Sequence, residues 1–315
     1  THPKISANKI GMSVRQLKNK KTNMSMKSTL NNEFIIEDIS NGLEPSPVSL
    51  VYNDDKELEE LHVHQKYVVR CVIPSLGNEI VTSEELSSYY DGCDCADNCI
   101  LEDCGCKSTH GYFYTSQHSN QRGLNLNSPV PTSIFECNSS CTCTPKVCPN
   151  RIVQHGINIP LQVFKTRDGR GWGLRTLQKI YKGMFVCEYA GEIIKTEEAK
   201  RRWEEMKNNT MARNYVLCLK EHVQDRILRT NIDPIHIGNA GRYINHSCAP
   251  NLQIYLVRIN SLIPVAAFFA VRDIEIGEEL TFDYSGADGH NGQLESGAMI
   301  DGIEGEKGMK KCLCG

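Results

Sequence analysis

The chain has 315 residues, enough for one large domain or two ordinary ones, and its 40% apolar content is normal for a globular protein. It contains no run of about 18 apolar residues and no N-terminal secretory signal, so we expect neither a transmembrane helix nor a membrane partner. The net charge of −3 favours no class of partner by itself. The 15 cysteines, in a chain without a secretory signal, indicate metal ligands rather than disulfides.

Basic residues are concentrated at the N-terminus, where residues 1–32 contain no acidic side chain. The basic positions are Lys4, Lys9, Arg15, Lys18, Lys20, Lys21 and Lys27. This composition is typical of a basic flexible tail, and the alternative is nonspecific contact with DNA phosphates or an acidic chromatin surface. Residues 33–90 are then expected to form an N-terminal flank, with strands near 33–39 and 67–73 and a helical turn near 54–60.

Two blocks of cysteines follow within residues 91–150. The first block is Cys93, Cys95, Cys99, Cys104 and Cys106, and the second is Cys137, Cys141, Cys143 and Cys148. Two separate four-cysteine zinc sites would leave one cysteine over. Three tetrahedral zinc ions need twelve ligand positions, which nine sulfurs fill if three of them bridge two ions each. Structural zinc contributes roughly 10–16 kcal/mol per ion in small peptides, enough to order a segment with almost no apolar core.

From residue 151 to residue 286 the pattern changes to short apolar segments of strand length. Strands are expected near 161–164, 184–189, 215–219, 252–259, 263–271 and 281–284, and an amphipathic helix after Thr196. Residues 107–136 are expected to form a long loop, and residues 287–315 a flexible linker. Together these elements predict a mainly β fold with short helices.

The densest polar stretch is residues 241–251 (GRYINHSCAPN), which lies between two apolar, strand-like regions. Its Asn245 and His246 supply paired hydrogen-bond donors and acceptors, and Cys248 is a candidate metal ligand. Three further motifs accompany it: residues 171–173 (GWG), 188–192 (EYAGE) and 281–284 (TFDY). The glycines of the first motif allow a ligand to approach the backbone closely.

These motifs, in this order, resemble those of the SET-domain protein lysine methyltransferases of the Su(var)3-9 group. The resemblance extends over about residues 36–315 and is carried by residues 169–175 (GRGWGLR), 188–192, 242–248 (RYINHSC) and 281–284. The nine-cysteine array is similar to the pre-SET zinc cluster of the group. Residues 162–166 (QVFKT), 185–192 (FVCEYAGE) and 283–286 (DYSG) resemble one member of the group most closely.

The resemblance implies a SET-domain β-fold with a pseudoknot formed by residues 245–250. It implies a catalytic domain at 151–286, the flank 33–90 packed on it, a zinc-bound pre-SET region at 91–150 and a partial post-SET region at 287–315. Cys248, Cys312 and Cys314 are then three of the four ligands of a further, post-SET zinc. The family pattern continues with another cysteine beyond Gly315, so this fourth zinc is expected only where that ligand is present.

The implied chemistry is methyl transfer from S-adenosylmethionine to a lysine. The lysine must be neutral, which at pH 7.4 costs about 4 kcal/mol from a pKa of about 10.4, so an apolar aromatic channel is needed. By resemblance, Tyr215 and Tyr284 flank the transferring methyl group, and Phe282 leaves room for di- or trimethylation. The residues implied to contact the donor are Arg170, Gly171, Trp172, Tyr215, Arg242, Asn245 and His246. Glu188 and Glu192 are expected to be structural rather than a catalytic acid pair.

The resemblance also implies a substrate: the tail of histone H3, bound as an added strand, in the chromatin of the nucleus. Lysine 9 is the target typical of the group, whereas the member with the most similar phrases points to lysine 36 or lysine 4. A chromatin-binding module that has lost catalysis is the rival class. It predicts substitutions at Tyr215, Asn245, His246 or Tyr284, and the sequence contains none.

Overall fold

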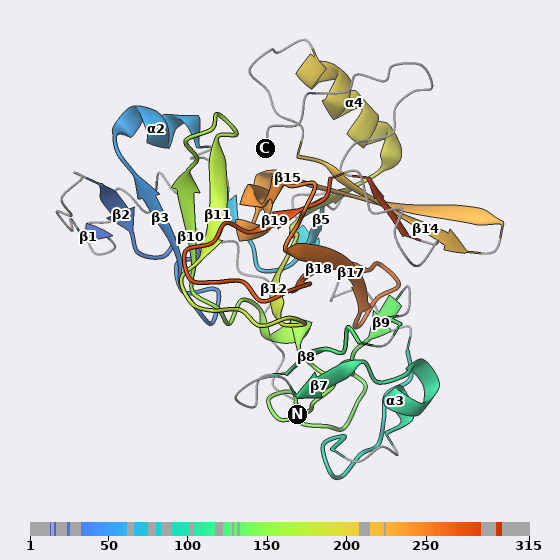
Figure 1. The fold of residues 1–315 in the computed structure, drawn as a ribbon. Helices are drawn as coiled ribbons and strands as arrows, with labels where there is room; N and C mark the ends of the chain where they lie inside the picture. The colour runs from blue at the N-terminus through green and yellow to red at the C-terminus, as the bar shows by residue number, and fades with distance from the viewer. Residues whose placement is uncertain are drawn as a thin grey trace.

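Short strands in several small sheets make up most of the fold, which confirms the predicted mainly β class with short helices (Figure 1). The computed structural model describes residues 13, 16, 24–25, 33–61, 66–74, 80–82, 90–100, 104–116, 122–127, 129–130, 133–207, 215–223, 225–284 and 294–297. Cys312, Cys314 and most of the predicted basic tail lie outside these residues. Within the described part, no helix is long and apolar enough to cross a membrane.

One sheet joins the N-terminal flank to the region that follows the cysteine blocks. Its strands, in spatial order, are β1 (Met24–Ser25), β2 (Phe34–Ile36), β3 (Val48–Tyr52), β10 (Leu161–Lys165) and β11 (Trp172–Thr176). β3 pairs in parallel with β10, so that Val48 lies opposite Leu161. Every residue of β3 is buried, and the flank therefore supplies a central strand of this sheet. β1 falls within the segment that the sequence analysis interprets as a tail.

A second sheet ties the cysteine-rich region to the rest of the chain. Its order is β12 (Phe185–Glu188), β18 (Val265–Ala270), β17 (Leu252–Arg258) and β9 (Ser133–Phe135). β9 comes from between the two cysteine blocks and pairs in parallel with β17, with Ile134 opposite Val257. All six residues of β18 are buried, as expected for a strand inside the core.

The third sheet reaches from the flank to the C-terminal region. Its order is β20 (Leu294–Gly297), β14 (Leu217–Val223), β15 (Arg226–Gly238), β13 (Gly191–Ile194), β5 (Val72–Pro74) and β6 (Ile80–Thr82), with β4 (Lys66–Tyr67) paired to the end of β15. The single strand expected near residues 67–73 is therefore two strands with different partners. β20 lies in the segment expected to be a linker, and it pairs with the outer edge of β14.

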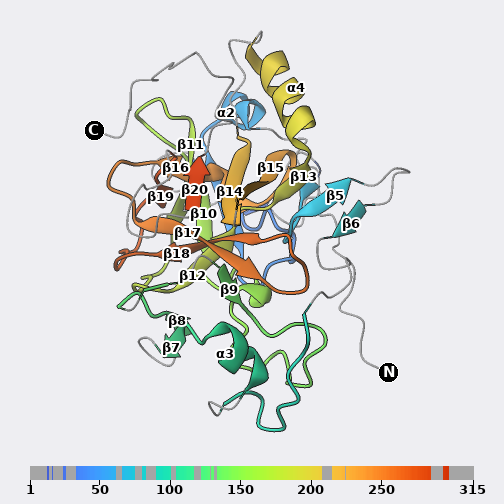
Figure 2. The same ribbon diagram turned by 90° about the vertical axis from the view of Figure 1, so that its right-hand side faces the viewer.

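The helices are short, and the remaining strands form two isolated pairs. The α-helices are α2 (Asp55–Glu60), α3 (Gly105–His110) and α4 (Thr196–Lys207), and the 3-10 turns are η3 (Val153–His155) and η4 (Ala240–Tyr243). The first strand pair is β7 (Tyr114–Ser116) with β8 (Arg122–Leu124). The second is β16 (Asn245–His246) with β19 (Thr281–Phe282). In both views α3 and the β7–β8 pair lie at one end of the molecule and α4 at the other (Figures 1 and 2). The predicted core cysteines Cys71, Cys187 and Cys218 are buried.

A buried carboxyl, Glu44, joins the flank to the chain just before β10. It accepts hydrogen bonds from the Tyr67 hydroxyl at 3.1 Å and the Ile157 backbone N–H at 2.9 Å. Burial raises the pKa of Glu44 from 4.5 to about 7, because neither bond fully replaces water around a charged carboxylate. Between these pH values the folded chain retains a proton that the unfolded chain releases, so the free energy of unfolding falls as the pH rises.

We expect Glu44→Gln to remove this pH dependence. The stability of the variant relative to the wild type should therefore increase by up to about 3 kcal/mol between pH 5 and pH 8, since the wild type alone must ionise a buried group. Denaturant unfolding of both proteins at the two pH values measures the difference. Other titrating groups cancel in that comparison, so an equal stability difference at both pH values would contradict the prediction.

Candidate active site and metal centre

The parallel pair β16–β19 places two of the polar motifs side by side. Asn245 lies opposite Thr281 and His246 opposite Phe282. Asn251 secures the pair, because its Oδ1 accepts the Thr281 backbone N–H at 2.8 Å. This parallel pairing involves the stretch, residues 245–250, in which the resemblance places the pseudoknot of the fold.

Aromatic rings gather beside this pair. The ring of Phe282 lies 4.7 Å from that of Tyr284 and 5.0 Å from that of Phe268, measured between centroids. The Tyr284 hydroxyl donates to the Ile244 carbonyl at 2.9 Å. Phe282 is buried whereas Tyr284 is half-buried, so the two rings present a partly accessible aromatic surface with one fixed hydroxyl.

The backbone fixes the orientation of His246. Its Nδ1 accepts the Tyr284 backbone N–H at 3.1 Å, and its Nε2 lies 3.3 Å from the Sγ of Cys248. Nδ1 is also 3.6 Å from the Asp283 carboxylate, but the shorter contact with an N–H donor requires an unprotonated Nδ1. His246 therefore contributes to the position of the Tyr284 backbone.

Tyr215 lies two residues before the start of β14 and contacts other residues through both its backbone and its ring. Its carbonyl accepts a hydrogen bond from the Tyr189 hydroxyl, and its ring stacks on Arg242, whose guanidinium carbon is 4.4 Å from the ring centroid. Arg242 is 3% exposed, and its Nη1 donates to the Pro234 carbonyl at 3.1 Å. Its Nε and Nη2 have no partner among the described residues. A buried guanidinium with unused donors is costly unless a ligand accepts from them.

The glycine-rich turn between β10 and β11 is tied to the same place. Gly171 has φ of +94°, a left-handed conformation that glycine adopts without strain. Arg170 donates through both Nη atoms to the two carboxylate oxygens of Glu279, at 3.1 and 2.7 Å. Asn245 Nδ2 donates to the Trp172 carbonyl at 3.1 Å and to Glu279 Oε1 at 2.9 Å. The Trp172 Nε1 is buried and, like the Nε and Nη2 of Arg242, has no hydrogen-bond partner in the described part of the chain.

The structure thus brings the predicted residues into adjoining groups: the 170–172 turn with Asn245, His246 with Phe282 and Tyr284, and Tyr215 with Arg242. Sequence reasoning missed Glu279 and Tyr189. Tyr189 stands inside the EYAGE motif, but nothing in that motif marks its hydroxyl as the partner of another residue's carbonyl. Glu279 lies in an ordinary acidic turn, and nothing in its sequence context indicates a contact with the site.

The two glutamates of the EYAGE motif make structural contacts, as expected. Glu188 pairs with Arg70 at 3.0 Å and is buried. Glu192 pairs with Arg202 of α4 at 2.9 Å. Both carboxylates are occupied by arginines, which fits structural ion pairs and not an acid–base pair.

The cysteines of both blocks form one cluster around α3. Its members are Cys93, Cys95, Cys99, Cys104, Cys106, Cys137, Cys141, Cys143 and Cys148. The Sγ atoms of Cys93 and Cys99 are 3.5 Å apart, those of Cys106 and Cys141 3.6 Å, and those of Cys99 and Cys137 3.8 Å. Two sulfurs about 2.3 Å from one tetrahedral zinc lie about 3.8 Å apart, so the cluster has the spacing of shared zinc ligands.

Several sulfurs fall into more than one set of four mutually close ligands. The sets are Cys93, Cys99, Cys137 and Cys143; Cys93, Cys104, Cys106 and Cys137; and Cys93, Cys95, Cys99 and Cys104. Bridging of two metal ions requires such sharing. Arg151 and Asn150 donate to the Sγ atoms of Cys143 and Cys137, each at 3.5 Å, as partners of thiolates do.

Cys248 is exposed and stands apart from this cluster. Its contact with His246 Nε2 is the one described above. Two of the expected post-SET zinc ligands, Cys312 and Cys314, lie outside the residues that the structure describes.

Comparison with known proteins identifies the class. The SET domain family matches residues 171–285 and the Pre-SET motif matches residues 40–151. Histone-lysine N-methyltransferase SETMAR of Bos taurus is 41% identical over 228 residues, covering 72% of this chain and 72% of that protein. Histone-lysine N-methyltransferase SUV39H1 of Xenopus laevis is 39% identical over 247 residues, covering 75% of this chain and 55% of that protein.

Solved structures agree. The methyltransferase domain of human SETMAR superimposes with a TM-score of 0.68 at 35% identity, covering 88% of this chain and 94% of that one. A complex of KRYPTONITE with mCHH DNA, an H3(1-15) peptide and SAH gives a TM-score of 0.60 at 26% identity, covering 83% and 50%. The chain belongs to the SET-domain histone-lysine N-methyltransferases of the Su(var)3-9 type, and it is an enzyme of that class. SETMAR is the member of the group that the phrases at residues 162–166, 185–192 and 283–286 are predicted to resemble, and it is among the relatives found.

Proposed function

We propose that this enzyme transfers methyl groups from S-adenosylmethionine to a lysine of histone H3, with lysine 9 as the preferred target. The observation that carries the proposal is that the 170–172 turn, Asn245 and the Phe282–Tyr284 pair all lie at the β16–β19 pairing. S-adenosylmethionine would supply an electrophilic methyl group there. Action on H3 places the enzyme in the nucleus, on chromatin.

The residues present fit this donor. Trp172 Nε1 and the Nε and Nη2 of Arg242 are buried donors with no partner among the described residues, and a ligand with a carboxylate and hydroxyl groups can accept from them. The proposed donor site consists of Arg170, Gly171, Trp172, Tyr215, Arg242, Asn245 and His246. Arg170 and Asn245 are both held by Glu279, so they would orient the turn rather than move on binding.

Tyr215, Phe282 and Tyr284 are proposed to form the lysine channel. Aromatic walls lower the pKa of an amine by excluding water, and they still tolerate a methylated ammonium product. The Tyr284 hydroxyl is already engaged by the Ile244 carbonyl, so it supplies a fixed dipole instead of a free acid. Phe282 adds no hydroxyl to restrain the amine, which leaves room for di- or trimethylation.

Lysine 9 is the target implied by the resemblance to the Su(var)3-9 group, and the H3(1-15) peptide bound to KRYPTONITE contains positions 4 and 9 but not position 36. Mass spectrometry of recombinant H3 after incubation with the enzyme and S-adenosylmethionine tests the proposal. Methylation at lysine 9 is the expected result. Methylation only at lysine 36 or lysine 4 would overturn the target, and donor binding without methylation of any histone lysine would overturn the reaction.

We also propose that the nine clustered cysteines hold three zinc ions, and that Cys248, Cys312 and Cys314 contribute to a fourth. In this division residues 91–150 are the pre-SET zinc region, residues 33–90 the N-terminal flank packed on the catalytic domain, residues 151–286 the catalytic domain, and residues 287–315 the linker and post-SET part. The sulfur spacing of 3.5–3.8 Å supports the cluster. The basic residues of 1–32 would add a nonspecific DNA contact.

An acceptor that binds as an added strand would compete with β20. β20 occupies the outer edge of β14, with Gly297 opposite Cys218, close to Tyr215. We expect Glu295→Pro/Ser296→Pro, which removes backbone donors from β20, to lower the KM for an H3 peptide by about tenfold if the lost pairing is worth about 1.4 kcal/mol. Peptide-dependent kinetics measure it, and the KM for S-adenosylmethionine is the control. An unchanged or higher peptide KM would contradict competition at this edge.

A further inference from the structure

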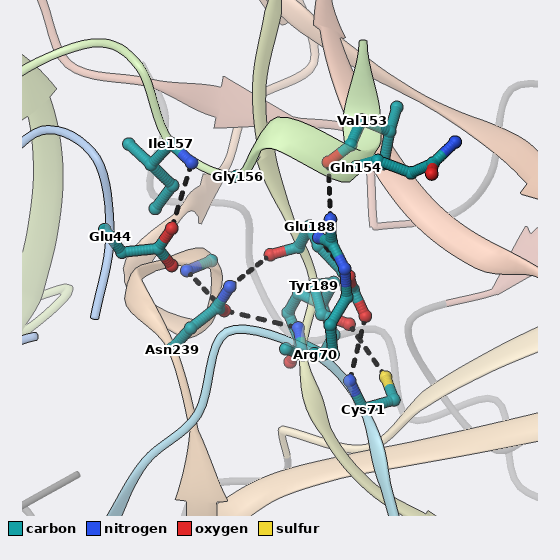
Figure 3. Close-up of polar contacts among 12 residues, drawn as sticks. Glu44, Arg70, Cys71, Val153, Gln154, Gly156, Ile157, Glu188, Tyr189 and Asn239 are labelled. Carbon is teal, nitrogen blue, oxygen red and sulfur yellow. Dashed lines mark hydrogen bonds and ion pairs between the residues drawn. The ribbon is translucent and has the colours of Figure 1, made fainter. Parts of the chain in front are cut away.

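A buried ion pair joins the N-terminal flank to the catalytic motifs (Figure 3). Arg70 Nη1 donates to Glu188 Oε2 at 3.0 Å, and the Cys71 backbone N–H donates to Glu188 Oε1 at 3.0 Å, so the flank holds both carboxylate oxygens. Arg70 Nη2 donates to the Val153 carbonyl at 2.7 Å. Burial raises the pKa of the Glu188 carboxyl, and the charge of Arg70 opposes that rise.

The backbone of Glu188 continues this network toward the 241–251 stretch. Asn239 Nδ2 donates to the Glu188 carbonyl at 2.8 Å, and Asn239 Oδ1 accepts from the backbone N–H groups of Ala190 at 3.2 Å and Gly241 at 3.0 Å (Figure 3). A Cβ at Gly241 would lie 2.7 Å from the Glu188 carbonyl oxygen, so the approach requires glycine. Asn239 therefore fixes the start of η4 against the end of β12, and η4 leads directly into β16.

A second branch runs through Tyr189. Its hydroxyl donates to the Tyr215 carbonyl, and its own carbonyl lies 3.6 Å from the Sγ of Cys71. Its backbone N–H donates to the Ala266 carbonyl of β18 at 2.8 Å. A shift of the Glu188–Tyr189 corner would therefore move Tyr215 on one side and the η4–β16 segment on the other.

We propose that Arg70 is a positioning residue for methyl transfer, acting through Glu188, Tyr189 and Asn239 on the two segments that form the site. This inference rests on the proposed function, because it concerns the geometry of that reaction. A buried ion pair adds little net stability compared with apolar residues of similar size. A purely stabilising role is therefore a weak explanation for the Arg70–Glu188 pair. A misplacement of about 1 Å, by contrast, lowers a reaction rate about 10²-fold.

Arg70→Met and Arg70→Lys, made in the full chain, test the proposal. Lysine keeps the charge, but a single ammonium group does not bridge Glu188 and Val153 as the guanidinium fork does. We expect kcat to fall about 10- to 100-fold in Arg70→Met and by a smaller factor in Arg70→Lys, with the KM values for S-adenosylmethionine and H3 peptide changing less than about threefold. Circular dichroism and Tm establish that each variant is folded. The matched control is Lys179→Met, which breaks the exposed 2.6 Å pair with Glu275 and should leave kcat unchanged.

A second measurement separates positioning from simple destabilisation. If Arg70 acts through Asn239, then Arg70→Met/Asn239→Ala should lose little more activity than the more severe single variant. Three results would each overturn the proposal. The losses of activity in the two single variants could add fully in the double variant, the Arg70 variants could change only KM, or Arg70→Lys could retain the wild-type kcat. Should Arg70→Met fail to fold, Arg70→Lys decides alone. A wild-type chain that methylates no lysine overturns the proposed function and this inference together, whereas an active wild type with a fully active Arg70→Lys overturns only the inference.

Discussion

Replacement of Tyr284 by phenylalanine is expected to lower kcat by about 10²-fold or more while the protein stays folded. The hydroxyl that is lost donates to the Ile244 carbonyl at 2.9 Å and fixes the ring between Phe282 and His246. Without it the ring keeps its apolar contacts but not its position, so the stability loss should be only about 1 kcal/mol. Methyl-transfer kinetics with saturating donor and peptide, together with Tm, measure both effects.

Tyr255→Phe provides the matched control. Tyr255 lies on β17, and its hydroxyl donates to Gln253 at 3.2 Å on an exposed surface. Its removal deletes the same atom away from the proposed channel, so kcat should change by less than about twofold. If Tyr284→Phe retained wild-type kcat, or lost activity only in proportion to unfolded protein, Tyr284 would be a core residue and the channel would lie elsewhere.

The motifs that define the class could be identified from the sequence because their chemistry is local. An Asn–His pair, a glycine-rich turn and a TFDY segment can each be recognised in the sequence without knowing which residues they contact. Their pairing depends on tertiary structure: β16 and β19 meet in parallel, although 36 residues separate the two members of each paired position, Asn245–Thr281 and His246–Phe282. The contact of Glu279 with both Arg170 and Asn245 likewise has no local signal.

The largest miss is β15, a 13-residue strand that was not predicted. The charged residues of β15 obscure the alternation of apolar and polar positions that is typical of a strand, and Pro234 argues against the interior of a strand. The structure resolves the conflict with a register shift opposite Gly191 and Glu192, where β15 has extra residues and Pro234 need not donate to a neighbour. Similarly, the run 67–73 divides into β4 and β5 because Arg70 turns inward to Glu188 instead of continuing the ladder.

The long loop expected at 107–136 contains structure for a related reason. α3, β7, β8 and β9 are each only three to six residues long, too short for a periodic pattern to emerge. They are held by longer-range contacts, such as the pairing of β9 with β17 and the packing of Cys104 and Cys106 in the cysteine cluster. Local order in this region therefore depends on the cysteine cluster and on strand pairing more than on the intrinsic secondary-structure propensity of these short segments.

Cys137→Ser should accordingly reduce the bound zinc and unfold the cysteine-rich region. Cys137 is fully buried, belongs to two of the three sets of close ligands, and lies 3.8 Å from Cys99. Structural zinc contributes roughly 10–16 kcal/mol per ion in peptides, and whole domains are stable by only about 5–15 kcal/mol, so losing one ion is enough to unfold the segment. Elemental analysis of zinc per chain and thermal unfolding, with and without a chelator, measure the result.

Cys187→Ser is the control, because Cys187 is equally buried but lies in β12, outside the cluster. It should lower Tm by burying a hydroxyl, yet leave the zinc content unchanged. A zinc content equal to the wild type in Cys137→Ser, or no zinc in the wild type, would refute the metal centre. If Cys137→Ser lost both its zinc and the β9–β17 pairing, the result would mean that the metal orders a strand of the catalytic sheet. Chelation would then inactivate the enzyme through its fold, without any metal at the lysine channel.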